Sequence, residues 1–192
     1  MKKILKPITG AVALAGFIAI TGFVTLAPRN LSLARESRLW IEGTSTVKSF
    51  TCAATKVNVV ALAETESAPS DMVKSASVTI PVASLDCRNE TMNGHMRKAL
   101  KATENPQIAW KLSSYRVEGM NVVMTGTLSI AGKENPMELR ATGSAESNGT
   151  IRVKGSKEFR MTEFGVKPPS LMLGTMKVRD PVKVWFDFVL NP

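Results

Sequence analysis

Residues 87–110 read CRNETMNGHMRKALKATENPQIAW and hold the one clear helical pattern after residue 35. Four apolar side chains recur at i, i+4, i+7 and i+8, which puts them on one helix face: Met92, Met96, Ala99 and Leu100. Asn89 suits the N-cap of this helix, and Pro106 marks the far end of its connection to the next strand. One short amphipathic helix therefore interrupts a chain whose other segments have the pattern of strands.

The rest of the chain alternates apolar and polar residues with the period of two that is typical of a half-buried β-strand. The segments with this pattern are 39–48, 56–61, 75–82, 108–113, 122–130, 137–141, 151–154 and 182–190. Turn-forming residues at 118–119, 131–135 and 147–150 separate neighbouring segments, and connections this short join antiparallel strands. Amphipathic antiparallel strands in this number either close into a barrel or stack as a sandwich.

The amino terminus has the pattern of an export signal. Three lysines precede an uncharged run, residues 8–27, which is long enough to span a bilayer. The small-x-small rule allows cleavage after Ala27 or, with a better following residue, after Ala34. We therefore expect residues 1–34 to be a cleaved signal peptide or an uncleaved membrane anchor. Residues 35–192 are then one exported domain.

Charge and cysteine content narrow the class of protein. Residues 1–34 hold four basic and no acidic side chains, so their removal lowers the formal net charge from +9 to +5. That modest charge, mixed with acidic residues, does not indicate a nucleic-acid partner. Cys52 and Cys87 lie in the exported part, so we expect them to form a disulfide that closes a loop of about 35 residues. Two cysteines and one histidine are too few for a zinc site, so we expect no metal.

The sequence contains no pattern of catalytic residues. His95 is the only histidine, and neither a Gly-x-Ser-x-Gly elbow nor a nucleotide-binding glycine motif occurs. We interpret His95 as a surface or capping residue rather than a general base. Arg97, Lys98 and Lys101 either form a solvated helix face or bind an anionic headgroup at a pocket mouth. The sequence therefore predicts a binding protein, not an enzyme, and indicates no cofactor.

Several stretches resemble the YceI-like family, the polyisoprenoid-binding, lipocalin-like proteins of the bacterial periplasm. They are residues 39–50 (LWIEGTSTVKSF), 92–110, 126–132 (GTLSIAG), 163–166 (EFGV) and 178–182 (VRDPV), and their order and spacing carry the resemblance. The resemblance covers about residues 36–192. With the strand pattern, it implies an all-β fold: an eight-stranded antiparallel lipocalin-like barrel with one short helix between strands three and four. It also implies a long apolar tunnel inside the barrel.

In such a barrel the inward-facing apolar side chains line the tunnel. We predict the following ligand-binding residues: Val78, Ile80, Ile108, Trp110, Leu112, Met124, Leu128, Phe164, Phe186 and Phe188. The resemblance implies a ligand such as a polyisoprenoid, a quinone-like lipid or a fatty-acid derivative, carried without a turnover step. The alternative is a membrane-anchored structural or stress-response adaptor whose barrel has a solid core. Membrane association through residues 8–27 and a homodimer are further expectations.

Overall fold

The computed structural model describes residues 29–63, 73–171 and 175–192. Its strands are β1 (Arg29–Leu33), β2 (Arg38–Ser45), β3 (Ser49–Ala54), β4 (Asn58–Ala63), β5 (Val73–Pro81), β6 (Leu85–Asp86), β7 (Gln107–Glu118), β8 (Asn121–Ile130), β9 (Lys133–Ala145), β10 (Ile151–Arg160), β11 (Ser170–Leu171) and β12 (Met176–Asn191). The helical elements are α1 (Glu90–Ala99) and two 3-10 turns, η1 (Val82–Ser84) and η2 (Met161–Phe164). Within these residues no helix has the length and apolarity to cross a membrane. The segment 8–27 lies outside them.

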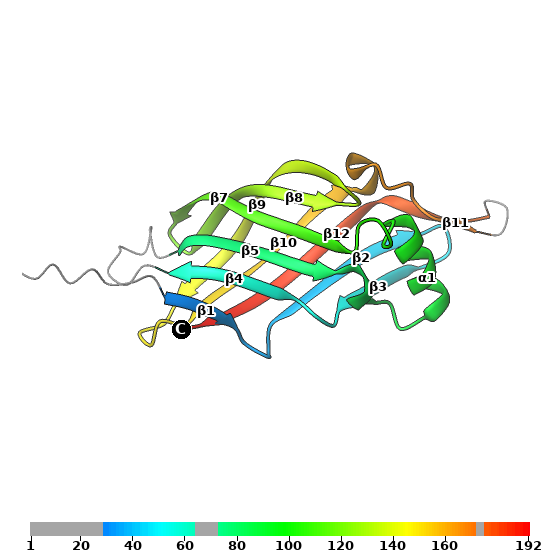
Figure 1. Cartoon of the computed structure of the whole chain (residues 1–192). Coiled ribbons are helices and arrows are strands. Elements are labelled where there is room, and N and C mark those ends of the chain that lie inside the picture. The colour runs from blue at the N-terminus through cyan, green and yellow to red at the C-terminus, as the bar shows by residue number, and fades with distance from the viewer. Residues whose placement is uncertain (1–28, 64–72, 172–174) are drawn as a thin grey trace, which may run out of the picture.

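The strands form an eight-stranded antiparallel barrel (Figure 1). β1 and β2 act as one long strand, and β3 and β4 as its antiparallel partner, because Leu31 pairs with Ala61 and Ile41 pairs with Cys52. β12 closes the barrel by pairing with β10 on one side and with β2 and β1 on the other. The predicted barrel, with one short helix between its third and fourth strands, is confirmed.

β1 lies on the amino-terminal side of the boundary expected after Ala34. It pairs with β4 and β12, and Leu31 is only 5% exposed. Arg29–Leu33 is therefore part of the barrel wall, although its short, polar-rich sequence gives no clear strand pattern. Cleavage or retention of the amino-terminal segment stays a prediction.

Two strands begin earlier than the sequence pattern predicts. β9 starts at Lys133 because Ala131 and Gly132, with φ of 50° and 80°, form a two-residue turn in place of the expected longer one. β12 starts at Met176, and its register with β2 shifts close to Pro181. A bulge of this kind accommodates a proline, which has no N–H to donate to the neighbouring strand. Because the bulge interrupts the regular pairing, a strict period of two does not identify the start of the strand.

α1 begins and packs as predicted. The side chain of Asn89 accepts a hydrogen bond from the backbone N–H of Met92 at 2.9 Å and so caps the helix. Met96, Ala99 and Leu100 pack against the apolar core at one end of the barrel. The helix therefore covers this end of the barrel with the apolar face that the spacing predicts.

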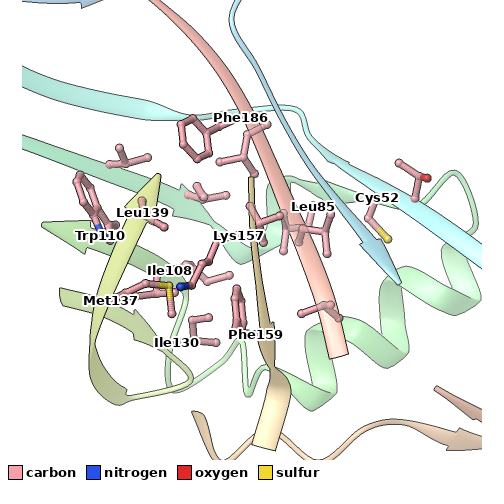
Figure 2. A pocket seen from close by; sticks show the side chains of 18 of the residues that line it. Cys52, Leu85, Ile108, Trp110, Ile130, Met137, Leu139, Lys157, Phe159 and Phe186 are labelled. Carbon is pink, nitrogen blue, oxygen red and sulfur yellow. The ribbon is translucent and has the colours of Figure 1, made fainter. Parts of the chain in front are cut away.

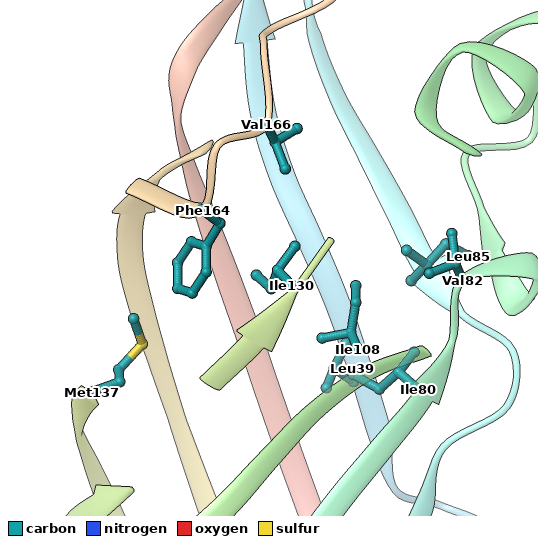
Figure 3. Close-up of a cluster of buried hydrophobic side chains, with 9 residues drawn as sticks. All are labelled: Leu39, Ile80, Val82, Leu85, Ile108, Ile130, Met137, Phe164 and Val166. Atoms are coloured by element: carbon teal, nitrogen blue, oxygen red, sulfur yellow. The ribbon is translucent and has the colours of Figure 1, made fainter. Parts of the chain in front are cut away.

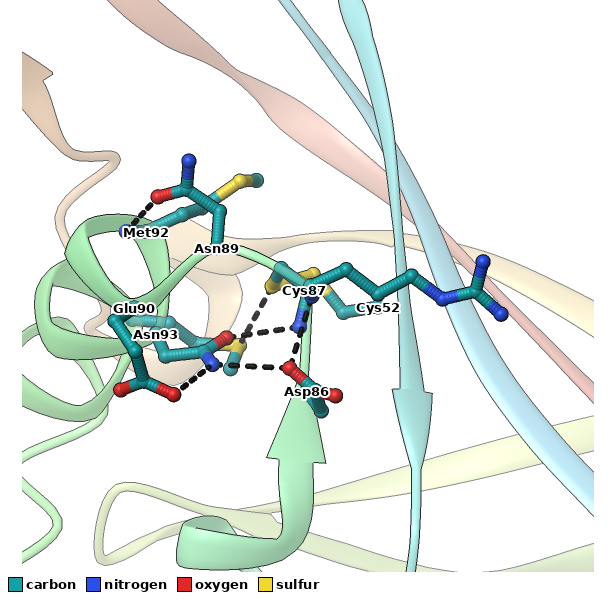
Figure 4. Close-up of a disulfide and its surroundings, with 9 residues drawn as sticks. Cys52, Asp86, Cys87, Asn89, Glu90, Met92 and Asn93 are labelled. Carbon is teal, nitrogen blue, oxygen red and sulfur yellow. Dashed lines mark hydrogen bonds between the residues drawn. A yellow bond between two sulfur atoms is a disulfide. The ribbon is translucent and has the colours of Figure 1, made fainter.

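The predicted disulfide joins Cys52 of β3 to Cys87, which follows β6 (Figure 4). The backbone N–H of Cys87 donates to Asn93 Oδ1 at 2.8 Å, and Asn93 Nδ2 donates to Asp86 Oδ1 at 3.0 Å. The hydrogen bond from Asn93 lowers the pKa of Asp86 because it stabilises the carboxylate. Together the disulfide and these hydrogen bonds fasten the start of α1 to the barrel wall.

Buried apolar side chains gather in two clusters. The larger one, next to α1, is hereafter the α1-end cluster (Figure 3), and it consists of Leu39, Ile80, Val82, Leu85, Ile108, Ile130, Met137, Phe164 and Val166. The smaller one lies around β1, β4 and the end of β12, and it consists of Leu31, Ala61, Ala63, Ile151 and Leu190. The two clusters leave part of the barrel interior unfilled.

Candidate ligand cavity

The barrel surrounds a cavity of about 1190 Å³ between its inward-facing side chains (Figure 2). All the residues predicted to bind a ligand lie on its wall: Val78, Ile80, Ile108, Trp110, Leu112, Met124, Leu128, Phe164, Phe186 and Phe188. The volume exceeds the range of about 300–1,000 Å³ that is typical of small-molecule sites. The structure thus brings the predicted residues together around one space, and their contact with a ligand stays a prediction.

The cavity extends along the barrel. At the α1 end its wall includes Met92 and His95 of the helix. At the opposite end the wall includes Val117 and Val122, on either side of the β7–β8 turn. On β7 the lining runs from Ile108 to Val117, which corresponds to roughly 30 Å of extended strand. The space is therefore long as well as large, and it suits an extended chain better than a compact ring system.

Glycines let aromatic side chains lie close to the cavity wall. A Cβ placed on Gly126 of β8 would come within 2.8 Å of Cε2 of Trp110, and one on Gly155 of β10 within 2.8 Å of Cζ of Phe186. Both approaches are closer than a side chain tolerates, so each ring lies in space that only glycine leaves free. This arrangement keeps the rings of Trp110 and Phe186 near the wall and leaves more of the cavity open.

The predicted ligand-binding residues include no charged side chain, yet one lies on a barrel strand of the wall. On β10 every second residue faces the inside of the barrel: Ile151, Val153, Gly155 and then Lys157. The side chain of Lys157 lines the cavity (Figure 2). The predicted strand ends at residue 154, so the alternation is not followed as far as Lys157. Extending the period of two by three residues would have identified this lysine as inward-facing.

The polar residues of α1 are divided between the cavity and the outer surface. His95 is half-buried and lines the cavity beside Met96, so the expected surface position is only partly correct. Arg97, Lys98 and Lys101 line a separate small surface depression and do not reach the cavity wall. Lys98 and Lys101 are exposed and match the solvated helix face, the first of the two alternatives considered, whereas Arg97 is half-buried and its Nη1 lies 3.9 Å from Glu90 Oε2.

On the outer wall, polar groups satisfy one another. Arg152 Nε and Nη2 donate to the two carboxylate oxygens of Asp187 at 2.9 and 2.8 Å, which lowers the pKa of Asp187 and raises that of Arg152. Glu42 accepts hydrogen bonds from the indole N–H groups of Trp40 and Trp185 at 3.0 and 2.8 Å. These contacts tie β2, β10 and β12 together and leave the cavity as the candidate site.

Comparison with known proteins identifies the family. The family model of the YceI-like domain matches residues 33–190, nearly the whole barrel. This chain belongs to the YceI-like family. No curated protein matches the YceI-like chain significantly.

Solved structures share the YceI-like fold. BcnA of Burkholderia cenocepacia superposes with a TM-score of 0.67 at 22% identity, over 80% of this chain and 95% of that one. A domain from Saccharophagus degradans, described as a polyisoprenoid binding domain implicated in plant cell wall breakdown, gives 0.64 at 14% identity, over 84% and 97% of the two chains. The YCEI protein of Campylobacter jejuni gives 0.59 at 17% identity, over 94% and 99%. These similarities establish the shared fold.

Proposed function

We propose that this YceI-like protein binds a long apolar ligand inside its barrel and carries it through an aqueous, exported compartment. The observation that supports the proposal most strongly is the cavity of about 1190 Å³, whose wall includes all the predicted apolar residues. The described binding of polyisoprenoid by the Saccharophagus degradans domain of the same fold is consistent with it. The proposal contains no catalytic step.

Burial of a hydrocarbon chain supplies the affinity. Each CH₂ group removed from water contributes about 0.8 kcal/mol, so a chain that fills a long cavity gains several kcal/mol without any polar contact. The ligand class proposed is a polyisoprenoid, a quinone-like lipid or a fatty-acid derivative. The cavity argues against the solid core that the alternative adaptor function requires.

The disulfide supports an exported location. A bond between Cys52 and Cys87 persists in an oxidising compartment and is rare in a reducing cytosol. We place the protein in the periplasm, with the amino-terminal segment as its export signal or anchor. Because β1 supplies Arg29–Leu33 to the barrel, retention of this strand favours either cleavage after Ala27 or an uncleaved anchor. A homodimer stays a prediction.

Native mass spectrometry of the exported protein, purified without denaturant, tests the function. We expect a lipophilic ligand to be present, and we expect the extracted protein to take up an added isoprenoid alcohol such as geranylgeraniol. Protein that is empty after gentle purification and takes up neither geranylgeraniol nor a fatty acid would contradict the proposal. The mass of the exported chain reports in the same experiment whether Arg29–Leu33 is retained.

A further inference from the structure

Lys157 is a basic residue on an otherwise largely apolar stretch of the cavity wall. It lies on β10 between Gly155 and Phe159, both inward-facing, and it is half-buried. In Figure 2 its side chain extends toward Met137 of β9, among apolar residues. The aliphatic stem packs well in such surroundings, whereas the terminal ammonium requires a polar partner.

Among the described residues Lys157 has no such partner. Its Nζ makes neither a hydrogen bond nor an ion pair with any of them, whereas Lys154, three residues earlier and outward-facing, lies 4.0 Å from Asp187. The described part of the cavity wall also contains no aspartate or glutamate. Among the described residues, the outward lysine of β10 therefore has a counter-charge and the inward one has none.

The other cations of the described wall lie elsewhere. Lys48 and Arg88 are both exposed, one in the β2–β3 turn and one before α1, so water hydrates them. Lys157 lies instead on a barrel strand, two residues beyond the last β9–β10 pair, Gly155 with Ala141. The β9–β10 ladder ends before Lys157. The backbones of β9 and β10 are therefore less tightly joined beside this lysine than at the start of β10.

We propose that the ligand is an amphiphile with a single carboxylate, and that this carboxylate binds the Nζ of Lys157 inside the cavity. The inference rests on the proposed carrier function and names its ligand class. An apolar chain that fills the cavity expels the water that hydrates the ammonium, and this loss is unfavourable unless an anion replaces the water. A carboxylate supplies the charge-assisted hydrogen bond that an alcohol or a hydrocarbon cannot supply.

The number of charges favours a carboxylate over a phosphate. Lys157 offers one positive charge, and the described wall near it offers no second cation. A carboxylate therefore gives a neutral buried pair. A phosphate monoester carries a charge of about −1.5 to −2 at pH 7 and would leave negative charge uncompensated in a low-dielectric space.

Palmitate and hexadecanol test this inference because they share a hydrocarbon chain and differ in headgroup charge. Affinities are measured for the delipidated full-length protein by displacement of a neutral fluorescent probe, at pH 7 and constant ionic strength. We expect palmitate to bind at least about tenfold more tightly than hexadecanol. Lys157→Met should reduce this ratio to about one by weakening palmitate alone, whereas the matched outward variant Lys154→Met should preserve it.

Each outcome separates the inference from the carrier function. Equal affinities in the wild type, or a ratio unchanged by Lys157→Met, would overturn the role of Lys157 and leave the carrier function standing. Tighter binding of hexadecyl phosphate than of palmitate would overturn the choice of a monoanion. Failure of both palmitate and hexadecanol to bind while geranylgeraniol still binds would overturn this inference alone, and failure of geranylgeraniol as well would overturn the carrier function itself. Circular dichroism verifies that each variant is folded. Lys157→Glu provides an independent test, because it should reverse the headgroup preference and favour hexadecylamine.

Discussion

The α1-end cluster and the middle of the barrel are built from the same kinds of residues and differ in how they are filled. Leu85 and Phe164 at the α1 end are 1% and 2% exposed and lie within the packed cluster. Leu112 on the wall of β7 is half-buried, belongs to neither cluster and faces the cavity. Apolar side chains therefore pack tightly against one another at the α1 end, whereas in the middle of the barrel they are less buried around the same cavity.

The difference arises from what covers the strands. At the α1 end the helix and the turns η1 and η2 place Met96, Val82 and Phe164 across the barrel, so side chains meet from several directions. In the middle, the described residues contribute the eight-stranded wall, and glycines at 126 and 155 let aromatic rings lie near it. An eight-stranded barrel is about wide enough for its side chains to fill it or to hold one ligand, so small changes of side-chain size decide between the two.

Removal of the disulfide should give the largest effect, because it releases the covalent link between β3 and the start of α1 and so frees the unfolded chain. The double variant Cys52→Ser and Cys87→Ser should lose about 3–4 kcal/mol of unfolding free energy, since the bond closes a loop with a sequence separation of 35. Urea denaturation measures the change. Reduction of the wild type should give a similar loss and should not affect the double variant. Equal stability of the variant and the oxidised wild type would show that this end does not depend on the bond.

A matched pair of leucines tests the comparison directly. Leu85→Ala should cost about 3 kcal/mol, because Leu85 is 1% exposed and the change removes its contacts within the α1-end cluster. Leu112→Ala should cost clearly less, because Leu112 is only half-buried, belongs to neither cluster and loses fewer contacts. Chemical denaturation of both variants gives the two values. An equal loss at both positions would mean that the middle of the barrel is packed as tightly as the α1 end.

Enlarging a side chain in the middle should affect binding more than stability. Met124→Trp puts extra volume into the cavity, so we expect a folded protein of nearly unchanged melting temperature whose affinity for geranylgeraniol falls at least about tenfold. Thr125→Trp, on the outward face of the same strand, is the control and should preserve binding. Unfolding of Met124→Trp alone would indicate overpacking of a filled core.

The smallest effect is expected from the outer wall in acid. The bidentate hydrogen bonds from Arg152 lower the pKa of Asp187, so the pair stabilises the fold above the unfolded-state pKa of the aspartate. This contribution is lost as the pH falls through the lowered folded-state pKa. Asp187→Asn should therefore reduce the melting temperature modestly at neutral pH and progressively less in acid. Glu158→Gln, on the outward face of β10, is the control, and a constant difference at all pH values would contradict the ion-pair explanation.

The sequence predicted the features that depend on local pattern. The period of two assigned the predicted ligand residues of the strands to the inward face, because successive side chains of a strand point to opposite sides, whereas Phe164 lies in a stretch that carries the family resemblance. The same rule missed Lys157, because the alternation was followed only to residue 154. It also missed β1, whose short polar-rich sequence becomes a strand only when β4 and β12 supply hydrogen-bond partners on both sides. These misses concern residues whose role depends on distant strands.

By itself, the sequence determined the side of the sheet on which each residue lies, the short helix with its Asn89 cap, and the cysteines available for a disulfide. Only the tertiary structure decided that the apolar side chains are packed most tightly at the α1 end, that a cavity runs along the barrel, and that Lys157 lies inside without a described partner. The physical reason is that the alternation of apolar and polar residues fixes the direction in which each side chain points. The space left inside the barrel depends instead on the distance between its opposite walls. That distance is set by strand number, stagger and the elements that cover the ends.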